Sequence, residues 1–158
     1  MDRKILFIVG LPGSGKTSIV NELSSQGYSV FDDYKAGAVN DDSAFNMSQH
    51  YSSLMKQLEE GKDCAILDID FCREEARQEA VTNIQNAFNN EIEVDWIFFE
   101  NEPYICVENV VNRHIESNKD QTGAIMNIGK YSPLYTIPNQ YEDKIKEVYR
   151  GKVQHCDR

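Results

Sequence analysis

The sequence predicts an α/β protein in which a parallel sheet lies between layers of helices. Strand and helix signals alternate along the 158 residues, as they do in βαβ units. The first strand signal, Ile5 to Val9, is apolar at every position, which is typical of a strand covered on both faces. The length predicts one domain that buries about two-thirds of the surface of its unfolded chain.

The elements of the first two-thirds of the chain are predicted from apolar periodicity and from helix start and stop residues. Ile19, Val20 and Leu23 lie on the inner side of the first helix, and Gly27 ends it. After strand 5–9 we expect a helix up to Gly27, a strand at 28–31, a helix from Asp42 or Ser43 to Gly61, a strand at 64–67, a helix at 73–89, a strand at 94–99 and a helix near 103–116.

In the last third of the chain, the sequence predicts a loop, an edge strand and one more helix. Residues 117–133 include Gly123 and Gly129 and few apolar anchors, so we expect a mobile loop there. Residues 134–137 are expected to add a fifth strand at the edge of the sheet. Residues 141–149 carry apolar side chains at helical spacing and predict the final helix.

Composition and charge exclude several classes of function. The 26 acidic and 16 basic residues give a net charge of −10, which argues against binding of double-stranded nucleic acid. The charge is uneven, since residues 1–112 hold 20 acids and 8 bases, whereas residues 113–152 hold 5 acids and 7 bases. The four cysteines form no Cys-x-x-Cys pair, which argues against a zinc site or a disulfide scaffold. No apolar run approaches the ~20 residues that cross a bilayer, so we expect a cytoplasmic protein without a membrane partner.

A phosphate-binding motif follows the first strand. The run Gly10-Leu11-Pro12-Gly13-Ser14-Gly15-Lys16-Thr17 matches Gly-x-x-x-x-Gly-Lys-[Ser/Thr] and stands between a strand and a helix, which is the context this motif needs. The glycines let consecutive N–H groups form an anion nest, and the helix N-terminus adds its positive end. Lys16 can reach the β- and γ-phosphates, and the Thr17 hydroxyl can bind Mg²⁺. We therefore expect a nucleoside triphosphate with Mg²⁺, held by Gly10 to Ser18.

The motif, the length and a glycine-containing loop late in the chain make the chain look like the small P-loop kinases. The expected fold is the three-layer P-loop NTPase fold, with a parallel sheet of four to five strands in the order 2-3-1-4-5. A single domain would span residues 1–158 and carry a late helical or loop lid at about 113–130. This resemblance implies ATP as the nucleotide.

Within that class, the chain resembles the 5′-hydroxyl polynucleotide kinase and zeta-toxin branch over roughly residues 4–137. The first match is Asp32-Asp33-Tyr34-Lys35, where polynucleotide kinases carry Asp-Asp-Tyr-Arg. The resemblance implies that Asp32 is the general base for the acceptor hydroxyl and that Asp33 and Lys35 lie beside the acceptor. Asp33 is the alternative base. Lysine lacks the planar fork of the family's arginine, so recognition of the acceptor is expected to differ.

The second match is the acidic run after the strand at 64–67. An acid in this place organises Mg²⁺ in related folds. Asp68 has the better strand context and is our preferred metal ligand, whereas Asp70 has the family's spacing to Arg77. Arg73 and Arg77 share one helix face by the i, i+4 rule and could together grip an acceptor phosphate. Their alternative is a surface pair that bridges Glu74 or Asp70.

The third match begins at Cys106-Val107, after which polynucleotide kinases carry arginines three and seven positions beyond the cysteine. The resemblance implies that Arg113, in the seventh position, stabilises charge on the transferring phosphoryl group. Asn109 replaces the other arginine, and Lys119 or Lys130 could compensate for it. Residues 131–138 stand where related kinases cradle the adenine.

The sequence therefore predicts an ATP- and Mg²⁺-dependent kinase. Its acceptor would be a hydroxyl or phosphate of a small metabolite, nucleoside or nucleotide. One alternative is a polynucleotide 5′-kinase, which needs only a small basic groove for a single-stranded end. The other alternative is an ATP-binding switch protein, which would need no base to activate a hydroxyl.

Overall fold

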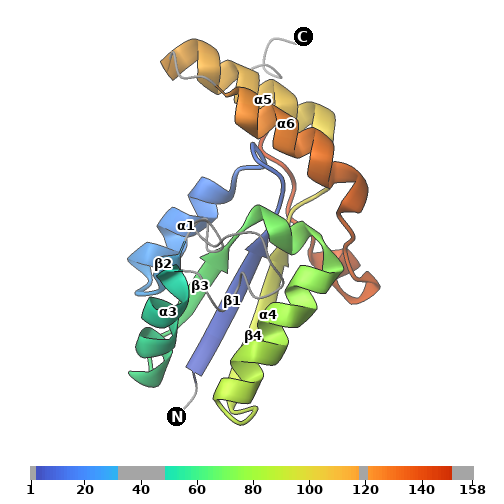
Figure 1. Cartoon of the computed structure of the whole chain (residues 1–158). Helices are drawn as coiled ribbons and strands as arrows, with labels where there is room; N and C mark the ends of the chain where they lie inside the picture. The colour runs from blue at the N-terminus through green and yellow to red at the C-terminus, as the bar shows by residue number, and fades with distance from the viewer. Residues whose placement is uncertain (1–2, 32–48, 118–120, 151–158) are drawn as a thin grey trace.

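The centre of the structure, a computed structural model that describes residues 3–31, 49–117 and 121–150, is a parallel sheet of four strands (Figure 1). The strands are β1 (Arg3–Val9), β2 (Ser29–Phe31), β3 (Cys64–Leu67) and β4 (Ile92–Phe98). Their order across the sheet is β2-β3-β1-β4, and each pairing is parallel. The predicted α/β class and the predicted order of the first four strands are confirmed.

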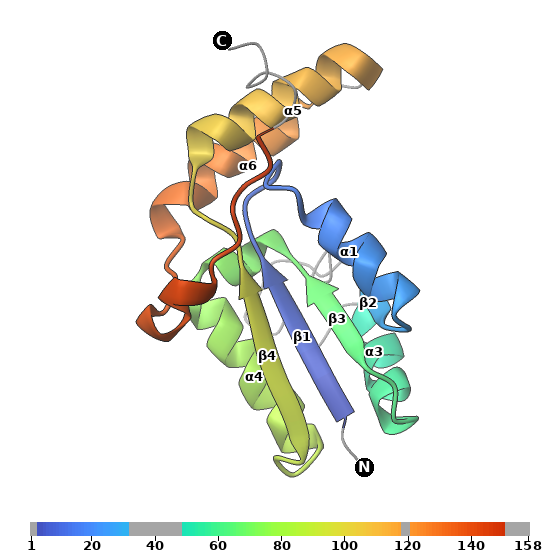
Figure 2. The same ribbon diagram turned by 180° about the vertical axis from the view of Figure 1, so that it is seen from behind.

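Helices cover both faces of this sheet, as the three-layer prediction required. The helices are α1 (Lys16–Ser25), α3 (Gln49–Glu59), α4 (Glu74–Ala87), α5 (Pro103–Ser117) and α6 (Thr122–Tyr131), with 3₁₀ turns η1 (Ile69–Cys72), η2 (Ser132–Leu134) and η3 (Asn139–Lys144). Helix α1 lies on one face, and α3 and α4 lie on the other (Figure 2). The predicted start of the helix at Asp42 or Ser43 lies outside the described residues. Within the described part of the chain, no helix is long and apolar enough to cross a membrane.

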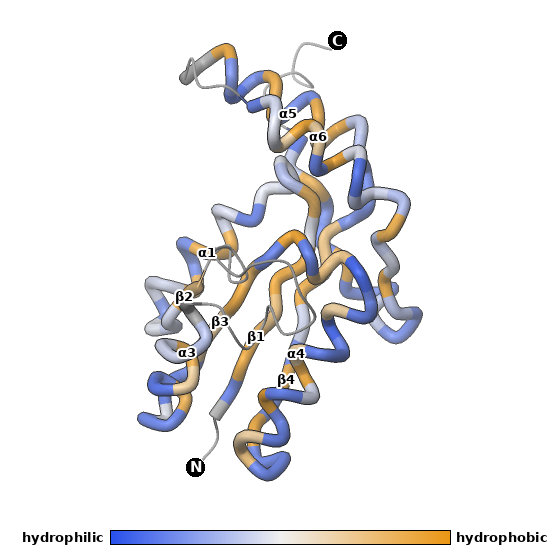
Figure 3. Tube along the Cα trace, in the orientation of Figure 1, coloured by the Kyte–Doolittle hydropathy of each residue, from blue (hydrophilic) through white to orange (hydrophobic). Residues whose placement is uncertain are grey.

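Strand β1 is buried on both sides, which explains its unbroken apolar run. Ile5, Phe7 and Val9 point into the larger core, whereas Leu6 and Ile8 point toward α1. All five side chains are at most 6% exposed. Figure 3 shows that apolar residues predominate along β1 and β3. This burial fixes the carboxyl end of β1 as a rigid base for the loop that follows it.

The neighbour of β4 differs from the predicted fifth strand. Lys146 N donates to Phe98 O at 2.8 Å and Glu100 N donates to Lys146 O at 2.9 Å, which makes a parallel bridge between Phe99 and Lys146. The prediction of a fifth strand at 134–137 is therefore wrong, because its place beside β4 belongs to the segment around Lys146. We call residues 145–150 the strap.

The predicted final helix over 141–149 is also wrong. Residues Asn139–Lys144 form a 3₁₀ turn, and the chain is extended from Ile145, whose φ and ψ are −70° and 132°. The apolar spacing still has a role, since Val148 is 1% exposed and Tyr141 packs against the larger core. The strap is extended because its backbone bonds to the end of β4 rather than to itself.

The described residues of the predicted loop at 117–133 are mostly helical. Helix α6 occupies 122–131 and, with α5, forms a hairpin over the carboxyl ends of the strands (Figures 1 and 2). Ala124, Ile128 and Tyr131 pack against the larger core and hold this helix. A Cβ at Gly123 or Gly129 would meet nothing within 4 Å, so these glycines lie on the outer side and do not end the helix. The expected lid region is therefore mostly helical.

The Tyr135 hydroxyl joins the ends of β1 and β4. It lies 3.3 Å from Val9 O and also hydrogen-bonds to Phe99 O, and burial raises its pKa well above the ordinary value. We predict that Tyr135→Phe lowers the free energy of unfolding by about 1–2 kcal/mol, because it removes a buried hydrogen bond. Urea denaturation measures the change, with Tyr104→Phe as the control because Tyr104 is 87% exposed. Equal stability of the two variants would contradict this role.

Candidate functional site

The glycine-rich loop, residues 10–17, joins β1 to α1 at the carboxyl edge of the sheet. Gly13 and Gly15 have φ values of 84° and 100°, in the left-handed region that L side chains rarely adopt. Ser14 N donates to Leu11 O at 3.2 Å and closes the turn, and Gly15 is the N-cap of α1. The turn therefore places the positive end of α1 beside the end of the central strand.

The Lys16 ammonium lies over its own loop. Its Nζ donates to Gly10 O at 3.0 Å, to Leu11 O at 2.8 Å and to Ser14 Oγ at 3.3 Å. These acceptors are uncharged, and hydrogen bonds between an ammonium and a phosphate are roughly twice as strong as those between neutral groups. A phosphate bound at the loop would therefore form a stronger hydrogen bond with this ammonium than each of these three acceptors does.

The outer side of the loop is tightly packed. A Cβ built at Gly13 would lie 2.5 Å from Cys106 O of α5, and a Cβ at Gly15 would lie 2.9 Å from the Cβ of Tyr149 in the strap. Only glycine fits at these two positions, for reasons of space as well as of backbone conformation. Helix α5 and the strap thus form a wall behind the loop.

A cleft of about 660 Å³ opens between the loop, the end of β3 and α5. Its lining includes Gly13, Lys16, Thr17, Asp68, Arg113 and Tyr149. The volume lies within the range of ordinary ligand pockets. The structure thus brings together, around one cavity, four residues that the sequence singled out from different parts of the chain: Lys16, Thr17, Asp68 and Arg113.

The side chains of Thr17 and Asp68 have the chemistry of a magnesium site. Both line the cleft, and both present hard oxygen atoms. Asp68 Oδ1 accepts from Asp70 N at 2.8 Å, and Asp70 forms an ion pair with Arg73. Among the described residues there is no group of three or more His, Cys, Asp or Glu that could hold a metal.

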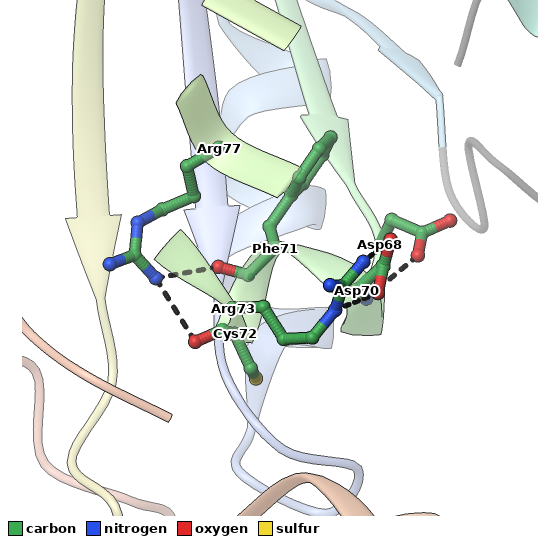
Figure 4. A network of polar contacts seen from close by, with 6 residues as sticks. All are labelled: Asp68, Asp70, Phe71, Cys72, Arg73 and Arg77. Atoms are coloured by element: carbon green, nitrogen blue, oxygen red, sulfur yellow. Dashed lines mark hydrogen bonds and ion pairs between the residues drawn. The ribbon is translucent and has the colours of Figure 1, made fainter. Parts of the chain in front are cut away.

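Arg73 and Arg77 do not lie together. Arg73 forms a bidentate ion pair with Asp70, in which Nε donates to Oδ1 at 2.7 Å and Nη2 donates to Oδ2 at 2.9 Å. Arg77 points to the opposite side (Figure 4), where Nη1 donates to Phe71 O at 2.8 Å and to Cys72 O at 3.1 Å. The Arg77 side chain is only 5% exposed, and its burial lowers its pKa. The two arginines therefore do not form the joint phosphate grip that their spacing suggested.

Several other site predictions have different outcomes. Asp32, Asp33 and Lys35 lie outside the described residues, so the acceptor side stays a prediction. Arg113 is exposed and lines the cleft, as expected of a residue that meets a phosphate. None of the residues 131–138, which the sequence placed at the adenine, lines the cleft, whereas Tyr149 does.

The thiols of Cys72 and Cys106 are buried in the larger core. Burial raises the pKa of Cys72 to about 12 and that of Cys106 to about 11, although the charge of Lys16 opposes both shifts. The thiolate is the reactive form of cysteine, and it is scarce at neutral pH when the pKa is this high. Burial therefore favours the neutral thiol form of both side chains.

Sequence reasoning missed Asn109. This side chain on α5 is 6% exposed, and its Nδ2 donates to Gly13 O at 2.8 Å and also to Tyr149 O. It thus connects α5, the loop and the strap. The one available signal was that an uncharged amide replaces a family arginine, and that signal does not reveal the partners.

No known family model matches the chain. The chain is similar to an uncharacterized protein of Acanthamoeba polyphaga mimivirus, with 28% identity over 155 residues that cover 95% of this chain and 100% of that protein. The comparison establishes a relative of nearly the same length, and its description assigns no activity.

The different surroundings of the two arginines give a paired prediction. Arg77→Met should lower the free energy of unfolding by about 2–4 kcal/mol, because it leaves buried carbonyls without their charged donor. Arg73→Met should cost about 1 kcal/mol or less, since it removes a partly exposed ion pair. Chemical denaturation measures both changes, and similar losses for the two variants would contradict this assignment of Arg77.

Proposed function

We propose that the protein is an ATP- and Mg²⁺-dependent phosphotransferase. The observation that supports this best is that one cleft is lined by the glycine-rich loop, Lys16, Thr17, Asp68 and Arg113. The loop matches a phosphate-binding motif in sequence and stands between a buried strand and a helix N-terminus. The acceptor would be a hydroxyl or phosphate of a small metabolite, nucleoside or nucleotide.

The loop, Lys16, Thr17, Asp68 and Arg113 each have a role in this proposal. The loop amides and the N-terminus of α1 hold the β-phosphate, and Lys16 turns from its loop carbonyls toward the β- and γ-phosphates. Thr17 and Asp68 hold Mg²⁺. Arg113 approaches the phosphoryl group from α5 and stabilises the charge that develops there.

The reaction needs a base on the acceptor side, and the proposal gives this role to Asp32. Its carboxylate accepts the proton of the acceptor hydroxyl, the hydroxyl oxygen bonds to the γ-phosphorus, and the bond from that phosphorus to the bridging oxygen breaks. ADP leaves with the bonding electron pair. Asp33 is the alternative base.

The first test removes the ammonium. We predict that Lys16→Ala lowers ATP turnover by at least about 10²-fold, because it deletes the charge that stabilises the transferred group. Release of ADP is measured with Mg²⁺ present and after its removal by a chelator, which should also stop turnover. Lys62→Ala is the matched control, since Lys62 is exposed and lies outside the cleft lining. Full turnover in folded Lys16→Ala protein would disprove the proposal.

The second test separates a kinase from a switch. We predict that Asp32→Asn lowers phosphoryl transfer by about 10²–10⁴-fold and leaves ATP affinity unchanged, because a general base acts on the acceptor. Single-turnover transfer and equilibrium ATP binding are measured together. The acceptors tested include nucleosides, nucleotides and a single-stranded oligonucleotide with a 5′-hydroxyl. A defect confined to Asp33→Asn would make Asp33 the base, and no defect in either variant would favour the switch protein.

A further inference from the structure

The carbonyl groups on the outer side of the glycine-rich loop have defined partners outside the loop. Asn109 Nδ2 donates to Gly13 O at 2.8 Å, and Tyr149 N donates to Ser14 O at 3.0 Å. The same Nδ2 also donates to Tyr149 O. Two consecutive peptide units of the loop are therefore held from behind, and the two holders are bonded to each other.

Holding a carbonyl also fixes the direction of an N–H. The peptide bonds of the described chain are trans, so the C=O of one residue and the N–H of the next point in opposite directions. With Ser14 O held by the strap, the Gly15 N–H is directed away from the strap. With Gly13 O held by Asn109, the Ser14 N–H is directed toward Leu11 O, which it reaches at 3.2 Å.

The strap is itself anchored, so these bonds join the loop to a fixed element. Glu100 Oε1, at the end of β4, accepts from Val148 N at 2.9 Å and from Arg150 Nη2 at 3.3 Å. Val148 is 1% exposed, and Lys146 is paired with β4. The chain of contacts therefore runs from the sheet through the strap to the loop.

The orientation of the Asn109 amide follows from its partners. Both acceptors near Nδ2 are carbonyl oxygens, so only the NH₂ end of the amide can face them. Its Oδ1 is buried and has no hydrogen-bond partner in the described part of the chain. A buried acceptor without a partner is costly, which indicates that the side chain is kept for the two bonds that it donates.

We propose that Asn109 is a positioning residue that, with the backbone N–H of Tyr149, presets the peptide planes of the glycine-rich loop for anion binding. This inference rests on the proposed function, since the anion is taken to be the phosphate chain of the nucleotide. Asn109 stands where polynucleotide kinases carry an arginine, and the inference gives it the role of holding the loop in place of a cationic role. Asn109 and Arg113, one helical turn further along α5, both line the cleft, and Asn109 also bonds to the loop.

The experiment compares Asn109→Leu, which keeps the approximate size but removes the NH₂ group, with Asn112→Leu on the same helix. The probes are inorganic tripolyphosphate, titrated by calorimetry, and amide hydrogen exchange of Ser14 and Gly15. We expect Asn109→Leu to weaken tripolyphosphate binding by roughly tenfold, the loss of about one hydrogen bond, and to raise the exchange of both amides. Asn112→Leu should change neither.

A second pair of variants tests the backbone bond from the strap. Tyr149→Pro deletes the N–H that Ser14 O accepts, and Tyr149→Ala keeps it. Faster exchange of the Gly15 amide is expected in Tyr149→Pro and not in Tyr149→Ala. Asn109→Arg separates positioning from charge, because a family-like cationic role predicts tighter tripolyphosphate binding, whereas loss of the two amide bonds predicts weaker binding.

The outcomes distinguish this inference from the proposed function. Unchanged exchange in both Asn109→Leu and Tyr149→Pro would overturn the positioning role, even if the wild-type protein binds tripolyphosphate. Tighter binding by Asn109→Arg would also overturn it. If the wild-type protein binds no tripolyphosphate, the proposed function fails, and so does the part of the inference that concerns anions. Exchange at Ser14 and Gly15 then still decides whether Asn109 holds the loop.

Discussion

The crowding behind the glycine-rich loop constrains the rest of the site. Gly13 lies against the backbone of α5, and Gly15 lies against the strap, at distances that leave no room for a Cβ. The atoms met are the Cys106 carbonyl oxygen and the Tyr149 Cβ, which the backbone holds in place and which cannot move aside as the end of a flexible side chain can. Helix α5 is therefore fixed at Cys106 and Asn109.

The strap can pack against Gly15 because the end of β4 holds it in place, although the strap does not form a complete fifth strand. Glu100 contributes its backbone N–H to Lys146 and its carboxylate to Val148 and Arg150. Along most of β4 the face toward α1 is polar, with Glu93 and Asp95 exposed, so that part of the sheet needs no further cover. The pairing is thus confined to the end of the strand that lies beside the loop.

The parts of the fold that were predictable are those whose signals are local. The apolar run at 5–9 is enough to predict strand β1, and the glycine spacing after it is enough to predict the turn at 10–17. Helix α6 was missed because Gly123 and Gly129 were interpreted as breakers, whereas the contacts of Ile128 with the core decide the outcome. Arg77 was misplaced because i, i+4 spacing does not reveal that the carbonyls of η1 lie within its reach. Asn109 depends on partners 40 and 96 residues away, which no local pattern records.

An acidic chain can bind a polyphosphate because the nearest charges matter more than the total. The net charge is −10, but two carboxylates near the cleft, Asp70 and Glu100, form ion pairs with Arg73 and Arg150. Charges more than about 8–10 Å away are largely screened at physiological ionic strength. Among the described residues, the charged side chains that line the cleft are Lys16, Arg113 and Asp68, two cations and one carboxylate. A phosphate that entered the cleft would therefore meet these three side chains and the held peptides of the loop, whatever the total charge of the chain.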